Sequence, residues 1–135
     1  MADLNGKTIA IIATDGFEDS ELTSPKEAVE TAGAATKVIS TETGEIEGKK
    51  GAKVAVDAKT ADASVDEFDA LILPGGTINA DTIRTDADAV ALVKAFKDAG
   101  KPIGVICHGG WILADADLLK GVKLTSVANV KTDLA

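Results

Sequence analysis

Four short apolar runs, separated by segments with helical signals, set the strongest limit on how this chain can fold. They are rich in β-branched residues and are bounded by Gly, Pro or Asp, as expected of strands buried on both faces of a sheet. The runs are Lys7–Ile12 (KTIAII), Thr36–Ser40 (TKVIS), Ala70–Leu73 (ALIL) and Ile103–Ile106 (IGVI). Alternation of strands and helices predicts a mostly parallel sheet with helices on both faces, a doubly wound α/β sandwich.

Two of the intervening segments carry the start and stop signals of helices. The first helix is expected to have Ser24 as its N-cap and Pro25 as its first residue, and to end at Gly33. The second is expected to be capped by Thr85 and to end at Gly100. Both patterns fit helices that cross over between parallel strands.

A different pattern occupies Glu42–Thr60, where polar and apolar residues alternate around a Gly-Lys-Lys-Gly turn. This alternation is typical of an exposed β-hairpin. The chain shows no internal repeat, low-complexity tract or linker, and its 135 residues suffice for one domain. We therefore expect residues 1–135 to form a single domain with a small hairpin excursion.

The charge and composition restrict the partners and the compartment. The formal net charge is −8, which argues against nucleic acid or an anionic membrane as a partner, because both bind basic surfaces. The N-terminal MADLNGKT lacks the features of a signal peptide, and no apolar run approaches the ~18 residues of a membrane span. A single cysteine cannot form an internal disulfide. We expect a cytoplasmic protein.

Three of the predicted strands lead into loops with unusual residues. The first strand is followed by Asp15–Asp19 (DGFED), the third by Pro74–Gly76 (PGG) and the last by Cys107–Gly109 (CHG). In open parallel sheets, binding sites form beyond the carboxyl ends of the strands. The sequence therefore predicts that these three loops meet at one edge of the sheet.

The last of these loops holds the only cysteine and the only histidine of the chain, Cys107 and His108, followed by two glycines. A nucleophile at a sharp strand-to-helix turn stands clear of the sheet. A helix N-terminus and a nearby imidazolium both favour the thiolate. Backbone N–H groups of His108 and of Gly75 or Gly76 could form an oxyanion hole. The pattern predicts a cysteine nucleophile.

Each of these residues also has a structural interpretation. A lone cysteine at the end of a buried strand is often an inert core residue, and His108 could simply cap a helix. Glu18 lies in a turn where acidic residues are common and are often only solvated. One His and one Cys cannot make a tetrahedral metal site without scattered carboxylates, and no phosphate-binding glycine motif occurs. We expect no metal and no cofactor.

Four segments of the chain resemble a known family: DGFEDSEL, LILPGG, KPIGVICHGGWIL and GVKLTS. In this order, from about Leu4 to Leu134, they are similar to the PfpI family of intracellular-peptidase-like proteins. That family stands with the Parkinsonism-associated deglycases in the class I glutamine amidotransferase-like superfamily. The resemblance implies a flavodoxin-like three-layer sandwich and a homodimer or higher homo-oligomer. Members usually continue beyond the equivalent of this chain's last residues with another strand and a final helix.

The resemblance also implies roles for individual residues. It makes Cys107 the nucleophile, His108 its adjacent partner and Glu18 a carboxyl group bonded to the sulfur. Backbone N–H groups of Gly76 and His108 would be the oxyanion donors. A carboxyl group that touches a thiolate favours its protonated form, which would make Glu18 neutral and a hydrogen-bond donor. Asp81 is the nearest candidate for an acidic residue that reaches a neighbouring subunit's histidine.

The activities that this resemblance implies diverge. The leading hypothesis is a stress-protective cysteine enzyme of the glyoxalase or deglycase type, acting on reactive carbonyls or early glycation adducts. Because the same groups could attack a peptide carbonyl, the alternative is an intracellular cysteine peptidase. An alternative of another class is a redox sensor or holdase without turnover, since an accessible thiolate oxidises readily. The glutaminase reaction is disfavoured, because the glutaminase version places its His and Glu far beyond the Cys and this chain has no second histidine.

Overall fold

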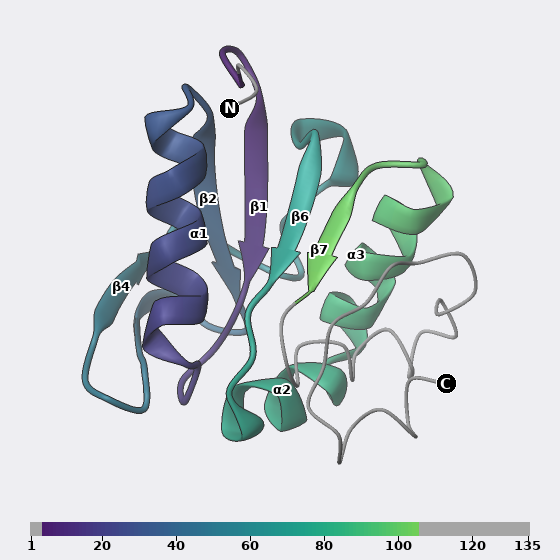
Figure 1. Ribbon diagram of the computed structural model, residues 1–135. Helices are drawn as coiled ribbons and strands as arrows, with labels where there is room; N and C mark the ends of the chain where they lie inside the picture. The colour runs from purple at the N-terminus through teal and green to yellow at the C-terminus, as the bar shows by residue number, and fades with distance from the viewer. Residues whose placement is uncertain (1–3, 106–135) are drawn as a thin grey trace.

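A central parallel sheet, a separate two-stranded hairpin and three α-helices make up residues 4–105, the part of the chain that the computed structural model describes (Figure 1). The elements are β1 (Thr8–Ile12), α1 (Asp19–Thr31), β2 (Ala35–Ser40), β3 (Gly44–Glu47), β4 (Lys53–Val56), β5 (Ala58–Lys59), a 3₁₀ turn η1 (Val65–Glu67), β6 (Ala70–Leu73), α2 (Thr77–Arg84), α3 (Ala87–Asp98) and β7 (Ile103–Val105). Strands and helices alternate as the sequence predicts.

The order of the strands places a switch in direction at the centre of the sheet. The order is β5-β2-β1-β6-β7, and every neighbouring pair is parallel. From β1 the chain moves to one side to form β2, and later crosses to the other side to form β6. Ile11 of β1 is thus opposite Val38 on one side and Ile72 on the other. This confirms the flavodoxin-like doubly wound sheet, and such a switch point is where open α/β sheets bind ligands.

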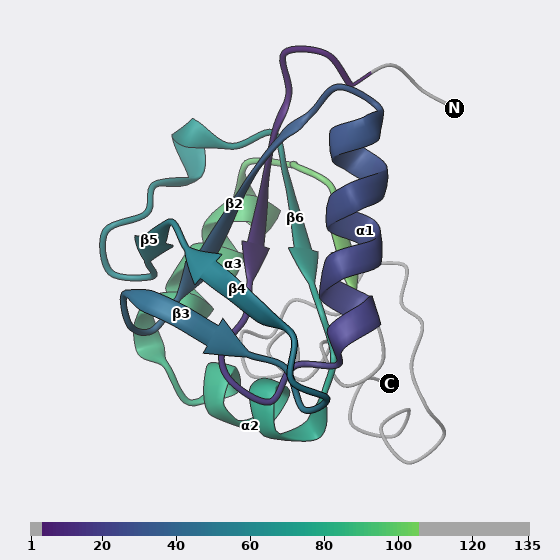
Figure 2. The same ribbon diagram turned by 90° about the vertical axis from the view of Figure 1, so that its left-hand side faces the viewer.

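The two faces of the sheet are buried by different elements. Alternate residues of a strand point to opposite faces. Accordingly, Ala10 and Ile12 of β1 belong to a core shared with α3, whereas Ile11 and Ala13 belong to a core shared with Phe17 and α1. Figures 1 and 2 show α1 and α3 on opposite sides of the sheet. The result is the expected three-layer sandwich.

The predicted strands agree with the observed ones to within a residue at each end that lies in residues 4–105. Each is nearly continuous in apolar residues because helices cover both faces, so the buried pattern is not interrupted by a solvated face. The predicted end of the last strand, Ile106, lies outside the described residues.

The predicted start of the first helix is wrong. The helix α1 begins at Asp19 rather than after Ser24, and Pro25 lies inside it. Pro25 removes one N–H from the helix ladder, which normally weakens a helix at that point. The first turn is nevertheless stable because Leu22 is fully buried in the same core as Phe17. Tertiary burial therefore overrides the local proline signal.

The cap of α3 is displaced by one residue from its predicted position. The side chain of Asp86, not Thr85, accepts hydrogen bonds from the backbone N–H groups of Asp88 and Ala89, at 2.9 and 3.3 Å. Thr85 instead ends α2, where its hydroxyl donates to the carbonyl of Thr82. Asp and Thr are both good caps, so the sequence alone does not separate them. The predicted helix ends at Gly33 and Gly100 are confirmed by positive φ angles of 105° and 71°.

The predicted hairpin is confirmed in part. Strands β3 and β4 pair antiparallel, with Ile46 opposite Val54. Residues Ala58–Lys59, which the prediction included in the hairpin, form β5 and pair parallel with β2 at the edge of the main sheet. The backbone N–H of Asp57 donates to the Val38 carbonyl and so leads the chain from the hairpin back to the sheet.

Candidate active site

The loops after β1 and β6 lie against each other at the carboxyl edge of the sheet. The backbone N–H of Glu18 donates to the carbonyl of Gly75 at 3.2 Å. Gly76 has a φ of 95°, and a Cβ atom there would lie 2.4 Å from the Gly16 carbonyl oxygen and 2.6 Å from the Glu18 nitrogen. Only glycine allows this approach. The predicted meeting of these two loops is confirmed.

The third predicted loop follows β7. Val105 of β7 is opposite Leu73 of β6, so the two strands end at the same level of the sheet. Cys107 and His108 come two and three residues after Val105 in the sequence and lie outside the described residues. Their predicted roles, and the backbone donor at His108, stay predictions.

A carboxylate that the sequence analysis missed lies at the glycine loop, which is defined here as Pro74–Gly76. Glu21, in the first turn of α1, accepts a hydrogen bond from the Gly75 N–H through Oε1 at 2.8 Å. This N–H, one of the two predicted glycine donors, therefore already has an acceptor. Glu21 lies three residues after Glu18, which is about one helical turn. A predicted helix start at Asp19 would therefore have placed Glu21 near the same loop. The misplaced helix start concealed this signal.

Glu18 itself faces the hairpin. Its side chain is 18% exposed, and its carboxylate oxygens lie 2.6 Å from Lys49 Nζ and 3.3 Å from Lys50 Nζ. The hydrogen bond from Lys49 is the main cause that lowers the pKa of Glu18, burial opposes it, and Lys50 adds to the lowering. These contacts favour the ionised carboxylate, whereas the family resemblance suggested a neutral one. The predicted bond to the Cys107 sulfur stays a prediction.

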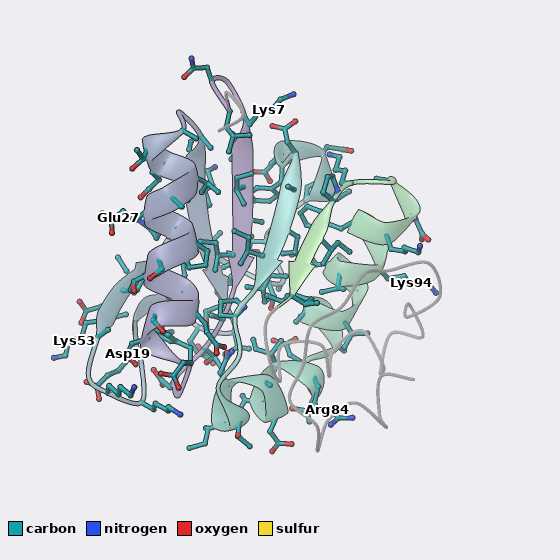
Figure 3. All side chains as sticks on the ribbon, in the orientation of Figure 1. Lys7, Asp19, Glu27, Lys53, Arg84 and Lys94 are labelled. Atoms are coloured by element: carbon teal, nitrogen blue, oxygen red, sulfur yellow. The ribbon has the colours of Figure 1, made fainter. Side chains whose placement is uncertain are left out.

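Two further carboxylates fasten the hairpin, whose turn is residues 48–52, to the loop after β1 and the start of α1. Asp19 accepts from the backbone N–H groups of Lys50 at 3.0 Å and Ala52 at 2.9 Å. Asp15 accepts from the Glu47 N–H at 2.8 Å. The Lys50 N–H is the main cause that lowers the pKa of Asp19. We call this set of contacts, with those of Glu18, the charged clasp; Figure 3 labels Asp19 on the hairpin side of the molecule.

A buried amide holds the glycine loop from the other side. Asn79 of α2 is 1% exposed, and its Nδ2 donates to the carbonyls of Pro74 at 3.1 Å and Gly75 at 3.0 Å. Its Oδ1 accepts from the N–H of Thr14, at the end of β1, at 2.7 Å. One neutral side chain thus links the carboxyl ends of β1 and β6.

The remaining predicted site residue, Asp81, is exposed on α2. It lies one turn from Ile78, a large apolar side chain that is 66% exposed. Its predicted contact with a neighbouring subunit stays a prediction.

Comparison with known proteins identifies the family. The sequence model of the DJ-1/PfpI family matches residues 7–135. The chain belongs to the DJ-1/PfpI family. The resemblance noted from the sequence motifs is therefore confirmed, together with membership of the class I glutamine amidotransferase-like superfamily.

Individual proteins are also similar to this chain. The chain is 49% identical to the uncharacterized protein SSP0918 of Staphylococcus saprophyticus over 96% of this chain and 76% of the relative. It is 43% identical to a protein of Bacillus subtilis named "Putative cysteine protease YraA", over 95% of this chain and 76% of the relative. A crystal structure from Anabaena variabilis, with DJ-1/ThiJ/PfpI-like and ferritin-like domains, matches with a TM-score of 0.90 and 30% identity. That match covers 95% of this chain and 37% of the two-domain protein.

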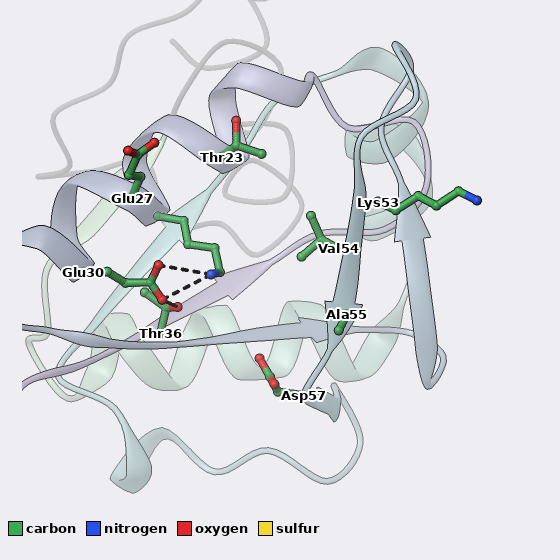
Figure 4. A pocket seen from close by; sticks show the side chains of 9 residues that line it. Thr23, Glu27, Glu30, Thr36, Lys53, Val54, Ala55 and Asp57 are labelled. Carbon is green, nitrogen blue, oxygen red and sulfur yellow. Dashed lines mark hydrogen bonds and ion pairs between the residues drawn. The ribbon is translucent and has the colours of Figure 1, made fainter.

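The described part of the chain has a hollow away from the glycine loop. It has a volume of about 440 Å³ and lies between α1, β2 and β4 (Figure 4). Within it Lys26 forms an ion pair with Glu30 at 3.2 Å, and Thr36 donates to the same carboxylate at 2.7 Å. The hydroxyl of Thr36 is the main cause that lowers the pKa of Glu30. Because these polar groups satisfy one another, we do not assign the hollow a catalytic role.

No group of three or more His, Cys, Asp or Glu side chains in residues 4–105 is arranged to hold a metal ion. No helix in this part of the DJ-1/PfpI chain is long and apolar enough to cross a bilayer.

Proposed function

We propose that this chain is a cysteine-dependent enzyme that acts on small reactive carbonyl compounds or early glycation adducts, with Cys107 as its nucleophile. The observation that supports it is the register between β6 and β7, in which Leu73 is opposite Val105. In this register β6 ends at the glycine loop. The strand β7 ends at the same edge of the sheet, two residues before Cys107 in the sequence. A thiolate and backbone N–H donors at one edge suit addition to a carbonyl.

The chemistry can be written for methylglyoxal. The Cys107 thiolate adds to the aldehyde carbon, a C–S bond forms, and the carbonyl electron pair becomes an oxyanion stabilised by backbone N–H donors such as that of Gly76. After protonation this is a hemithioacetal. Transfer of the proton on this carbon to the neighbouring ketone carbon oxidises the first and reduces the second, giving a lactate thioester. Water then hydrolyses the thioester to lactate and frees the thiol, so no external oxidant or reductant is needed.

Two carboxylates and His108 are candidates for the proton transfers. Glu18 is held by two lysine ammonium groups, which lower its pKa and weaken it as a base. Glu21 lies at the glycine loop itself, where its Oε1 accepts the Gly75 N–H at 2.8 Å, and this position makes it the stronger candidate of the two. A Glu21→Gln variant is expected to lose more turnover than Glu18→Gln.

A second candidate function is peptide hydrolysis, favoured by the protease designation in the name of YraA, which is 43% identical to this chain. The same nucleophile would attack the peptide carbonyl, and the same N–H donors would stabilise the tetrahedral oxyanion. The difference between the two functions lies in the leaving group, an amine in peptide hydrolysis.

The deciding experiment compares the purified chain with a Cys107→Ala variant on methylglyoxal and on a fluorogenic peptide. Consumption of methylglyoxal with formation of lactate, both lost in the variant, supports the first function. Thiol-dependent peptide cleavage without methylglyoxal turnover supports the second and contradicts the first. If the wild-type chain turns over neither substrate, both enzyme proposals fail. In that case a stable gain of two oxygens on Cys107 after mild peroxide, measured by intact mass, would favour a redox sensor.

A further inference from the structure

We propose that Asn79 is a positioning residue, which sets the direction of the Gly76 N–H by holding the Gly75 carbonyl. The inference rests on the proposed function, in which the Gly76 N–H stabilises an oxyanion. It concerns a residue that does not touch the substrate but determines how a donor group is presented to it.

The contacts of Asn79 use its whole amide group. Nδ2 donates to the Pro74 and Gly75 carbonyls at 3.1 and 3.0 Å, and Oδ1 accepts from the Thr14 N–H at 2.7 Å. The side chain is 1% exposed, so water cannot replace these bonds. A buried amide with both of its Nδ2 donor bonds and its oxygen in use has one orientation only.

The geometry of the peptide bond transmits this constraint to Gly76. The carbonyl of Gly75 and the N–H of Gly76 belong to one peptide unit, which is trans, so they point in opposite directions. The carbonyl is held by Asn79 Nδ2 at 3.0 Å and by the Glu18 N–H at 3.2 Å. The Gly76 N–H must therefore point away from both Asn79 and the Glu18 N–H.

The preceding peptide unit is fixed in the same manner. Its carbonyl, that of Pro74, is held by Asn79, and its N–H, that of Gly75, is held by Glu21 at 2.8 Å. Without such bonds, two consecutive glycines could reorient their peptide planes at low cost. Because Asn79 is neutral, it orients the loop without placing a net charge beside a developing oxyanion.

The competing explanation is that Asn79 only joins α2 to β1. That role predicts a loss of stability on substitution, with unchanged kinetics in the folded fraction. The positioning role predicts in addition a lower kcat, a nearly unchanged KM and a change in the environment of the Gly76 amide.

The test compares Asn79→Ala with a matched control, Thr60→Val. Thr60 is 5% exposed, and its hydroxyl donates to Asp86 at 3.1 Å, so the control removes a partly buried side-chain hydrogen bond, away from the glycine loop. Removal of an oxyanion donor lowers kcat by about 10²–10³-fold. Misdirection of such a donor is expected to cost less, about 10–100-fold in kcat, with KM changed less than about threefold. Thr60→Val is expected to leave kcat unchanged.

A second variant, Asn79→Asp, adds a pH signature. The neutral carboxylic acid can still donate to the Gly75 carbonyl, whereas the carboxylate repels both the Pro74 and Gly75 carbonyls. Its kcat is therefore expected to fall as pH rises through the pKa of the new carboxyl group. A descending limb at the same pH in the wild-type profile would contradict this assignment.

The closing measurement does not depend on turnover: amide NMR of Gly75 and Gly76 in the wild-type chain, in Asn79→Ala and in Thr60→Val. Displaced Gly76 signals and faster exchange of the Gly75 amide in Asn79→Ala alone support the inference. Unchanged glycine amides, or an unchanged kcat in an active chain, overturn it. If the wild-type chain has no turnover, only the proposed function fails, and the amide signals still decide whether Asn79 positions the peptide.

Discussion

The glycine loop and the charged clasp hold the same edge of the sheet by opposite means. The glycine loop is buried, and it is held by the neutral amide of Asn79 and by a backbone approach that excludes any Cβ at Gly76. The charged clasp is partly solvated and depends on Glu18 and Asp19 facing the hairpin turn. Buried neutral contacts respond to shape, whereas solvated charges respond to pH and salt. The bonds that Asn79 makes to the glycine loop are thus insulated from the changes of pH and salt that disturb the charged clasp, whereas the bond from the Gly75 N–H ends on a carboxylate, that of Glu21.

The largest effect on stability is expected from a substitution of Gly76, in the glycine loop. In Gly76→Ala the new Cβ would lie 2.4 Å from the Gly16 carbonyl oxygen, and the backbone would keep a φ of 95°. We expect a loss of about 3 kcal/mol or more in the free energy of unfolding, from the clash and the strained backbone together. Urea denaturation measures it.

The control for that substitution comes from the hairpin turn. Gly51 has a φ of 99°, and a Cβ there would meet nothing within 4 Å. Gly51→Ala is therefore expected to lose only the backbone term, about 1 kcal/mol. Equal losses of unfolding free energy in the two variants would show that the close approach of the loops at Gly76 adds nothing to the cost of the substitution.

A smaller effect is expected from the carboxylate that joins α1 to the glycine loop. Glu21→Ala leaves the buried Gly75 N–H without its acceptor, which should cost about 1–2 kcal/mol. Glu21→Gln keeps an acceptor oxygen and should cost less than about 0.5 kcal/mol. Glu27→Ala, at an exposed position of the same helix, is the control and should change stability by no more than about 0.5 kcal/mol. A loss in Glu27→Ala equal to that in Glu21→Ala would assign the effect to the helix instead.

The smallest effect is expected at the charged clasp and should depend on pH. Contacts in the folded chain lower the pKa values of Glu18 and Asp19, so these groups contribute stability that is fully present above their unfolded pKa values, about 4. That contribution is lost as pH falls through the lower folded values. Thermal unfolding of Asp19→Asn should therefore show a lower Tm than wild type at pH 7 and a smaller difference at pH 3. A difference that grows on acidification would contradict the sign.

Salt separates the two regions in the same experiment. The side chains of Lys49 and Lys50, which form ion pairs with Glu18, are 51% and 71% exposed. About 1 M salt should therefore screen these ion pairs. The difference in Tm between wild type and Glu18→Gln should shrink in salt. The difference for Asn79→Ala should not, because its bonds are buried and neutral.

The sequence predicted those features that depend on local burial, and missed those that depend on contacts between distant segments. The continuous apolar runs identified the strands of the main sheet other than β5, because a strand covered on both faces needs no alternation. The start of α1 was misplaced because Pro25 is a strong local signal, whereas the burial of Leu22 depends on Phe17 and the hairpin. β5 was assigned to the hairpin because its partner, β2, lies about 20 residues earlier in the chain.

The candidate site shows the same division. Strand ends and glycines indicated where the loops meet, and the described loops do meet there. The sequence did not indicate that Glu18 faces two lysines, since Lys49 and Lys50 are more than thirty residues away. Nor did it single out Asn79, because an asparagine in a helix is ordinarily solvent-exposed. Its role depends on a contact with Thr14, 65 residues earlier.

The central place of β1 has a consequence for the order in which the chain can assemble. One edge of β1 pairs with β2, which follows soon in the chain, but its other edge needs β6; Thr8 and Asp69, which hydrogen-bond beside that edge, are 61 residues apart. Until β6 has been synthesised, the TIAII strand exposes a row of unpaired backbone groups flanked by apolar side chains. Because the entropic cost of loop closure grows with loop length, we expect this closure to be slower than the pairing of β1 with β2. The nascent chain is therefore most prone to misassociate between the synthesis of β2 and that of β6.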